Sequence, residues 1–226
     1  MNTCIVVPVF DSPFINEVVE DIVRCGYKLL VVDDGSIPRV QFAGVEVIRH
    51  HQNMGKGAAI LSGAKRAKEL GYDSFVTFDA DMQHLSSQIP KLIASYKSGS
   101  IVIGNRDFSS SNVPNSSKFG RKFSNFWLLL ETWKSLGDTQ SGFRIYPVDI
   151  LELETKKRRF DFEVEVLALH AYRGGAIIDV EVECYYPPKE QRISHFDKVV
   201  DNLRLTRMHT KLMLQRYLLL RGFLWR

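Results

Sequence analysis

Short runs of β-branched and aromatic residues alternate along this sequence with longer segments whose apolar residues recur at helical spacing. Residues 74–78 are typical of the runs, and residues 14–24 are typical of the helical segments. Such an alternation predicts an α/β fold with a mostly parallel central sheet flanked by helices. Further strands are expected at 4–7, 27–32, 46–48 and 101–103, and further helices at 55–70, 89–96 and 164–172.

The length and composition are those of one folded domain. The chain has 226 residues, is 45% hydrophobic and carries a formal net charge of +4, which suits a single α/β core. We expect a main domain at residues 1–195 and a basic, amphipathic helical tail at residues 196–226. The serine-rich stretch at 109–117 is expected to be a surface loop, and such loops can also be mobile lids.

Acidic residues follow three of the predicted strands. Asp79 and Asp81 come directly after residues 74–78, Asp34 follows residues 27–32, and Asp11 closes the first strand. Open α/β sheets bind ligands at the carboxyl ends of their strands, and Mg²⁺ prefers one or two carboxylates together with substrate phosphates. Each site alone could be a solvated turn, but the three together indicate a nucleotide crevice.

A glycine-rich turn surrounds Lys56 at the start of a predicted helix. The spacing does not match a P-loop, because His50 and Gly57 stand where that motif needs Gly and Ser or Thr. Glycines at a helix start still let the backbone approach a ligand, so Lys56 could contact a phosphate or the nucleotide. A solvated lysine at a flexible turn is the alternative. His50 and His51 are expected at the surface.

Six short motifs occur in a familiar order. They are VVPVFD at 6–11, VDDGS at 32–36, NMGKG at 53–57, DADMQH at 79–84, GNR at 104–106 and QSGFR at 140–144. Together they resemble family 2 glycosyltransferases of GT-A fold, and within that family the branch of dolichol-phosphate mannose synthase and polyprenyl-phosphate glycosyltransferases. The chain departs from the usual pattern at Phe10, Asp11, Ser12 and Met82, where the family commonly has Tyr, Asn, Glu and Gly.

The resemblance implies an inverting, metal-dependent transfer of a sugar from a nucleotide-diphosphate sugar. A divalent ion, Mg²⁺ or Mn²⁺, would stabilise the departing diphosphate. The expected metal ligands are Asp79, Asp81, Gln83 and His195, with Asp81 the main one and His195 alternatively a structural histidine. The expected nucleotide-sugar site consists of Pro8, Phe10, Asp11, Asp34, Lys56, Asp79, Ala80 and Asp81. Asp34 is expected to read the base.

The acceptor is either a polyprenyl phosphate or a hydroxyl group. A phosphate needs arginines rather than a strong base, and the resemblance places the acceptor-binding residues at Arg106, Arg121, Gln140, Arg144, Glu163 and Arg192. Arg144 could instead form a structural ion pair. A hydroxyl acceptor needs a general base, for which Asp138 is the candidate, unless it buttresses the loop before Gln140.

The tail suggests contact with a membrane. Residues 186–226 contain nine Lys or Arg and three Asp or Glu, and a basic amphipathic segment can lie in an anionic bilayer surface. An apolar stripe is expected to join Phe196, Val199, Val200, Leu203 and Leu212. Packing on the core or on a second subunit is the alternative, so an oligomer could form through the tail. No apolar run reaches the ~18 residues of a spanning helix.

The remaining features favour a cytoplasmic enzyme, either free or at the inner face of the cell membrane. The first strand begins near residue 4, so no signal peptide is expected. Three widely spaced cysteines predict free thiols. A nucleotidyltransferase is less favoured because no glycine-rich loop follows the first strand. A non-catalytic nucleotide-sugar-binding protein is an alternative of another class. Nucleic acid is not expected as a partner, because the tail lacks interleaved aromatic residues before its last positions.

Overall fold

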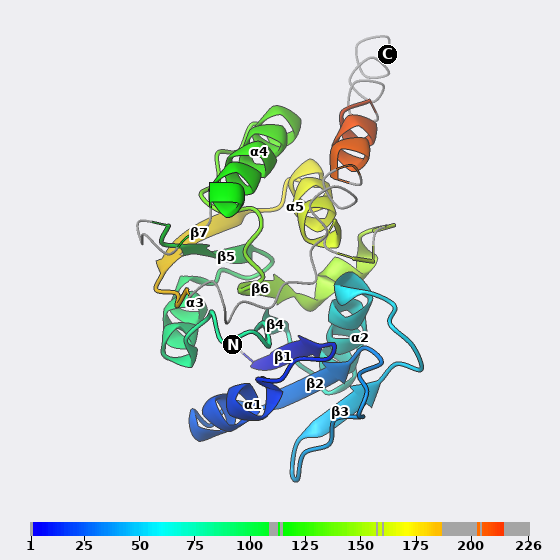
Figure 1. Ribbon diagram of the computed structural model, residues 1–226. Helices are drawn as coiled ribbons and strands as arrows, with labels where there is room; N and C mark the ends of the chain where they lie inside the picture. The colour runs from blue at the N-terminus through cyan, green and yellow to red at the C-terminus, as the bar shows by residue number, and fades with distance from the viewer. Residues whose placement is uncertain are drawn as a thin grey trace.

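The computed structural model describes residues 2–108, 113, 115–156, 158–159, 161–186, 203 and 205–214. These residues form one α/β domain in which a central sheet separates two groups of helices (Figure 1). The fold class predicted from the alternating pattern is therefore confirmed.

The sheet has seven strands in the order β3-β2-β1-β4-β6-β5-β7. Their bounds are β1 Thr3–Val9, β2 Leu29–Asp33, β3 Glu46–Arg49, β4 Ser74–Thr77, β5 Ile101–Arg106, β6 Arg144–Pro147 and β7 Ile177–Val182. Neighbouring strands run parallel except that β6 is antiparallel to both β4 and β5. The reversal at β6 returns the chain to the centre of the sheet beside the end of β4.

Helices cover both faces of the sheet. Their bounds are α1 Ile15–Arg24, α2 Lys56–Glu69, α3 Ile89–Ser95, α4 Asn115–Thr132 and α5 Phe162–Tyr172. One apolar core lies between the sheet and α1 with α3, and the other lies between the sheet and α2 with α5. Gly63 of α2 lies against Val6 so closely that a Cβ would overlap it, which brings the start of α2 near the end of β1.

The structure differs from the sequence-based expectation around residue 115. The stretch at 109–117 was expected to be a loop, but residues 115–117 begin α4, an 18-residue helix that the residue pattern did not predict. Residues 109–112 and 114 lie outside the described part of the chain. The strand β7, which pairs with β5 along its whole length, was also not predicted.

The described part of the tail is helical at residues 203 and 205–214. Leu205, Met208 and Leu212 belong to the same core cluster as α5, so this segment packs on the domain. The expected stripe that joins Leu203 to Leu212 is wrong, because Leu203 is exposed and Leu212 is buried. The two residues are nine positions apart, which is about two and a half helical turns, so they lie on opposite sides of the helix. Phe196, Val199 and Val200 lie outside the described residues, and the boundary at 195/196 stays a prediction.

Two further expectations concern covalent links and membranes. Cys4, Cys25 and Cys184 are free thiols, as expected. Within the described residues, no helix is long and apolar enough to cross a bilayer.

Candidate functional site

The carboxyl ends of β1, β2 and β4 lie side by side and carry the acidic residues. The register pairs Val9 of β1 with Asp33 of β2, and Val6 of β1 with Thr77 of β4. Asp11, Asp34, Asp79 and Asp81 follow these strand ends, so the structure brings together the three acidic segments that the sequence indicated.

Lys56 links two carboxylates at the centre of the site. Its Nζ lies 2.6 Å from Asp79 Oδ1 and 3.0 Å from Glu163 Oε1. Burial would lower the pKa of Lys56, but the charges of Asp79 and Glu163 outweigh it and raise the pKa. Burial likewise favours neutral Asp79, yet the charge of Lys56 beside it lowers the Asp79 pKa overall. Lys56 is therefore a fixed cation that keeps Asp79 ionised.

Gly142 permits this contact. A Cβ at this position would overlap Asp79 Oδ2 and Lys56 Nζ. The hydroxyl of Thr77 donates to the Gly142 carbonyl at 2.6 Å, which fixes the loop before β6 against the end of β4. The sequence identified Gly142 only as part of a motif. Its steric role could not be predicted, because it depends on a contact between distant segments.

Asp81 has a different environment from Asp79. Its Oδ1 accepts a hydrogen bond from the backbone N–H of Gln83 at 3.0 Å. Burial, followed by repulsion from Asp79, raises the pKa of Asp81 to about 6. Met82 between these residues has φ 60°, a left-handed conformation that favours glycine. A glycine would adopt this backbone more readily than a methionine does.

Asp79 and Asp81 carry the carboxylate oxygens that a divalent cation prefers as ligands. Among the described residues, no group of three His, Cys, Asp or Glu side chains is arranged to hold a metal. The repulsion between Asp79 and Asp81 is what a cation would relieve, and oxygen donors suit Mg²⁺ and Mn²⁺. His195, the fourth expected ligand, lies outside the described residues.

Asp34 organises the loop that carries Lys56. Its Oδ1 accepts from Met54 N at 2.9 Å, and its Oδ2 accepts from Gly55 N at 2.7 Å. His50 Nδ1 lies 2.6 Å from Asp34 Oδ1, and His50 Nε2 lies 2.9 Å from the hydroxyl of Ser62. His50 is buried, so its expected surface position is wrong. Asp34 is buried too, and its oxygens are occupied by protein donors.

Asp11 is the exposed acidic residue of the crevice. Its backbone N–H donates to Ser36 Oγ at 3.0 Å, and its Oδ1 accepts from Ile37 N at 2.7 Å. Phe10 is half-buried beside it, and Pro8 lies buried in β1. The neighbouring Ser12 hydroxyl donates to the carbonyl of Ala80, which ties this loop to the Asp79–Asp81 turn.

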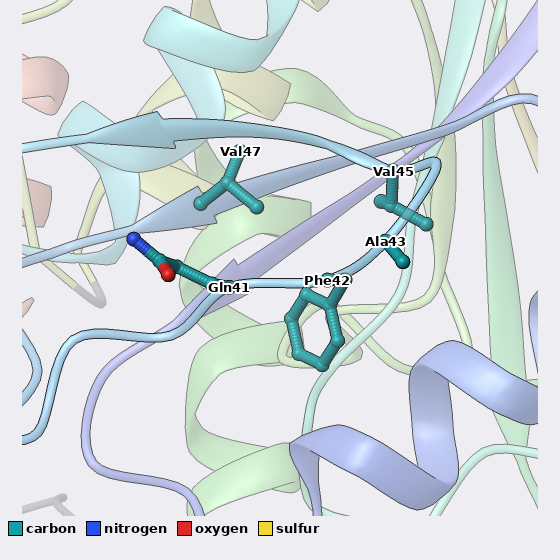
Figure 2. Close-up of a pocket in the computed structure, with 5 residues that line it drawn as sticks. All are labelled: Gln41, Phe42, Ala43, Val45 and Val47. Carbon is teal, nitrogen blue, oxygen red and sulfur yellow. The ribbon is translucent and has the colours of Figure 1, made fainter.

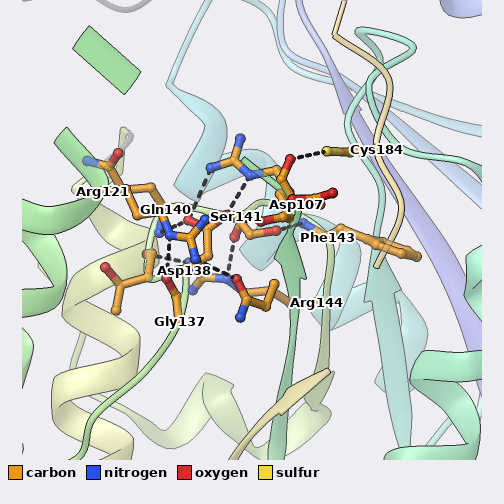
Figure 3. Close-up of polar contacts among 12 residues, drawn as sticks. Asp107, Arg121, Gly137, Asp138, Gln140, Ser141, Phe143, Arg144 and Cys184 are labelled. Atoms are coloured by element: carbon orange, nitrogen blue, oxygen red, sulfur yellow. Dashed lines mark hydrogen bonds and ion pairs between the residues drawn. The ribbon is translucent and has the colours of Figure 1, made fainter. Parts of the chain in front are cut away.

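Arg106 forms a bidentate ion pair at the end of β5 with Asp138, which is labelled in Figure 3. The distances are 2.6 Å from Arg106 Nε to Asp138 Oδ2 and 3.1 Å from Nη2 to Oδ1. Asp138 Oδ1 also accepts from Gln140 N at 3.2 Å. Burial would raise the Asp138 pKa, but Arg106 lowers it overall. A buried carboxylate held in this way is a weak base, so the contacts favour the buttressing role over general base.

Arg121 of α4 lies beside this pair. It donates to the carbonyls of Gly137 and Arg106 and to Asn105 Oδ1, the last two at 3.0 Å. The guanidinium carbons of Arg106 and Arg121 lie 5.2 and 4.5 Å from the ring centroid of Phe108. Two cations thus share one aromatic ring at the edge of the site. Arg192 lies outside the described residues.

Arg144 is not available to an acceptor. It is fully buried, and its guanidinium donates to the carbonyls of Ser141, Glu163 and Thr139 at 2.6, 2.6 and 2.8 Å. The expected acceptor contact is therefore wrong for this residue. The role of Arg144 is structural, but the alternative of an ion pair is wrong as well, because its described partners are three backbone carbonyls and the hydroxyl of Tyr146, and not a carboxylate.

His84 is a further residue that the sequence reasoning left without a role. Its ring lies 5.0 Å from Phe143 and 6.0 Å from Phe78, centroid to centroid. Burial lowers the His84 pKa to about 4, so the ring is neutral at pH 7. Its position directly after Gln83, an expected metal ligand, was the sequence feature that could have indicated a place near the site.

A surface hollow lies elsewhere on the molecule. Gln41, Phe42, Ala43, Val45 and Val47 line it beside the edge strand β3 (Figure 2). They lie in the segment that leads into β3 and in β3 itself. The hollow lacks ionisable groups and is separate from the site at the carboxyl ends.

Comparisons with known proteins agree with the motifs. The profile "Glycosyl transferase family 2" matches residues 4–153. UDP-N-acetylglucosamine--dolichyl-phosphate N-acetylglucosaminyltransferase of Methanococcus voltae is 32% identical over 152 residues, 63% of this chain and 60% of that one. Undecaprenyl-phosphate mannosyltransferase of Micrococcus luteus is 27% identical over 170 residues, 68% of this chain and 70% of that one.

The solved structures show the same fold. Glucosyl-3-phosphoglycerate synthase from Mycobacterium tuberculosis, in complex with Mn²⁺, UDP and glucosyl-3-phosphoglycerate, superposes with a TM-score of 0.67 at 17% identity. The match covers 95% of this chain and 79% of that one.

Proposed function

The chain belongs to glycosyl transferase family 2, and from this premise we propose that it moves a sugar from a nucleotide-diphosphate sugar to a polyprenyl phosphate. The observation that carries the proposal is the carboxylate crevice, in which Lys56 holds Asp79 ionised beside a differently tuned Asp81. The M. voltae and M. luteus relatives are named for transfer to lipid phosphates, which supports the acceptor class.

The donor would lie across the ends of β1, β2 and β4. Asp11 is exposed and can accept a hydrogen bond from the base or ribose. Asp34 would act on the donor only indirectly, because its oxygens accept hydrogen bonds from the backbone of Met54 and Gly55 and so fix the start of α2. Lys56 is already bound to Asp79 and Glu163, so its role would be to position these carboxylates.

Asp81, Asp79 and the Gln83 side chain would hold a divalent ion against the diphosphate. When bound, that ion supplies Lewis-acid stabilisation of the leaving diphosphate. Asp79 accepts from Lys56 on one oxygen, so its other oxygen faces Gly142 and the crevice. Asp81 forms no ion pair with a described residue, so its charge would be directed at the ion.

The state of Asp138 favours an acceptor that is already ionised. A hydroxyl acceptor would need a base to remove its proton, whereas Asp138 is fully buried, bound at both oxygens by Arg106, and lowered in pKa. A phosphate acceptor needs positive charge instead. Arg106 and Arg121 would supply it through the N–H groups not used by Asp138 and the backbone.

The experiment is to incubate the full chain with labelled UDP- and GDP-sugars, Mn²⁺, and either a short-chain polyprenyl phosphate or a soluble hydroxyl acceptor. We expect label to move to the polyprenyl phosphate with one nucleotide class, and Asp81→Ala to abolish transfer while Asp21→Ala, an exposed change on α1, leaves it intact. Transfer only to the hydroxyl compound, or undiminished transfer in excess chelator, would contradict the proposal.

A further inference from the structure

The outward face of α4 is apolar. Phe119, Phe126, Leu129, Leu130 and Trp133 are 69, 55, 40, 40 and 79% exposed, and their spacing places them on one stripe of the helix and its end. The adjacent helical segment adds Leu203, Met213 and Leu214, so these two segments hold eight of the fourteen exposed large hydrophobic side chains described. A concentration of this kind marks a contact surface.

Apart from Leu128, which packs in the core, the inward side of α4 is polar, unlike that of an ordinary surface helix. Arg121 and Asn125 both donate to the carbonyl of Gly137, and Asn125 Oδ1 accepts from Thr139 N at 3.0 Å. Glu131 is fully buried and bonds His209 at 2.9 Å. Polar contacts therefore fix this side of α4 to the domain, whereas Phe119, Phe126, Leu129 and Leu130 are exposed. Figure 1 shows α4 at the edge of the molecule.

Apart from Glu131, the charged side chains described on these two segments are positive. Lys118 and Lys122 lie on α4, and Arg207 and Lys211 lie on the helical segment that packs beside it. The only acidic residue in residues 115–134 and 203–214 is Glu131, which is buried against His209. The surface thus combines aromatic side chains with exposed cations and shows no exposed carboxylate among its described residues.

Trp133 is unfavourable both for the fold and for contact with water. It has φ 59°, a left-handed conformation that disfavours a bulky residue, and its side chain is 79% exposed. A glycine would suit this backbone better, and a polar side chain would suit water better. A contact outside the chain would account for a tryptophan here.

We propose that the face formed by α4 and residues 203–214 docks on an anionic lipid bilayer. Tryptophan and phenylalanine suit the boundary between acyl chains and headgroups, and lysine and arginine attract anionic lipids. A second copy of the chain fits less well, because its equivalent face would oppose cation to cation. Because Arg121 lies on α4, docking would bring the acceptor side of the site to the bilayer.

The test is co-sedimentation of the full chain with phosphatidylcholine vesicles, with and without phosphatidylglycerol. We expect binding to the anionic vesicles that weakens as salt is added. Trp133→Gly and Phe126→Ser should each weaken it about tenfold, because each removes a large apolar contact. Val23→Ser, on α1 with 48% of its side chain exposed, is the matched control and should bind as wild type does. Trp133→Gly should also melt no lower than wild type.

Wild-type binding in both variants would overturn the proposal, because the apolar face would then contribute nothing. Absence of vesicle binding, or self-association in ultracentrifugation that Phe126→Ser abolishes, would do the same. Donor affinity measured without lipid should be unchanged in these variants. If a variant loses vesicle binding but keeps its donor affinity, the defect lies in the docking face. If the wild-type chain binds vesicles but transfers no sugar, the proposed reaction is contradicted and the docking surface is not.

Discussion

Replacing Asp81 by Asn should stabilise the folded protein in the absence of metal. Burial and repulsion from Asp79 raise the Asp81 pKa from 3.8 to about 6, which means that the ionised side chain disfavours the native state. Asn keeps an oxygen that can accept from Gln83 N–H but carries no charge. The substitution therefore removes the repulsion while it retains the local hydrogen bond.

The magnitude follows from linkage. Because the folded pKa is raised, the carboxyl costs nothing below about pH 4, and its cost grows as pH rises from 4 to 6 and is complete above 6. At 1.36 kcal/mol per pKa unit the full cost is about 3 kcal/mol, and partial contact with solvent reduces it to about 2 kcal/mol. For a chain of this length we expect Asp81→Asn to melt roughly 4–8 °C above wild type at pH 7.5.

Thermal unfolding in excess chelator is the assay, with Asp21→Asn as a control for removal of an exposed charge. The difference between Asp81→Asn and wild type should shrink by about half at pH 5, since Asp81 is then largely protonated in the native state. With Mn²⁺ and the donor nucleotide the order should reverse, because only wild type gains from the metal. An Asp81→Asn variant that melts at or below wild type at pH 7.5 in chelator would refute the reasoning.

Three further substitutions test other parts of the site. Met82→Gly should raise stability by up to about 1 kcal/mol, because it removes a left-handed φ of 60° from a non-glycine residue; a lower melting temperature would argue against strain there. Gly142→Ala should leave the fold largely intact and lower kcat strongly, because its methyl would push Asp79 from Lys56; steady-state kinetics that match wild type would contradict this. Asp138→Asn should lower the free energy of unfolding by about 3 kcal/mol, because it leaves Arg106 buried without its partner. The same substitution should raise the acceptor KM and leave the shape of the pH profile of kcat unchanged. Loss of an ionisation from that profile would identify Asp138 as a base after all.

The sequence predicted the elements that place the site because their patterns are local. The stripe of α1 and the apolar runs of β1, β2 and β4 arise from residues close together in the chain, and the structure confirms them within a few residues. In a parallel sheet the carboxyl ends of neighbouring strands lie at the same edge, so carboxylates that follow these strands come close together. Their convergence was therefore predictable before any contact was known.

The partners of each charged residue were not predictable in the same way. Lys56 meets Glu163, which is more than a hundred residues away, and Arg106 meets Asp138 only because β6 reverses direction beside β5. Arg144 sits within a glutamine- and glycine-containing motif that suggests a ligand, yet its donors are used by backbone carbonyls. Charge and motif position identify a residue of interest, but the fold decides what it binds.

The failure to predict α4 has a physical cause of a different kind. A surface helix is normally recognised by an apolar stripe that faces the core, and in α4 the apolar stripe faces outward while Arg121, Asn125 and Glu131 face the domain. The serines and the proline before it resemble a loop, and the Phe-rich stretch after them lacks the expected polar exterior. A helix whose polarity is reversed relative to water is consistent with an environment other than water on its outer side. The outward apolar stripe thus explains why the sequence pattern did not predict α4, and it also supports a lipid surface as the partner of this helix.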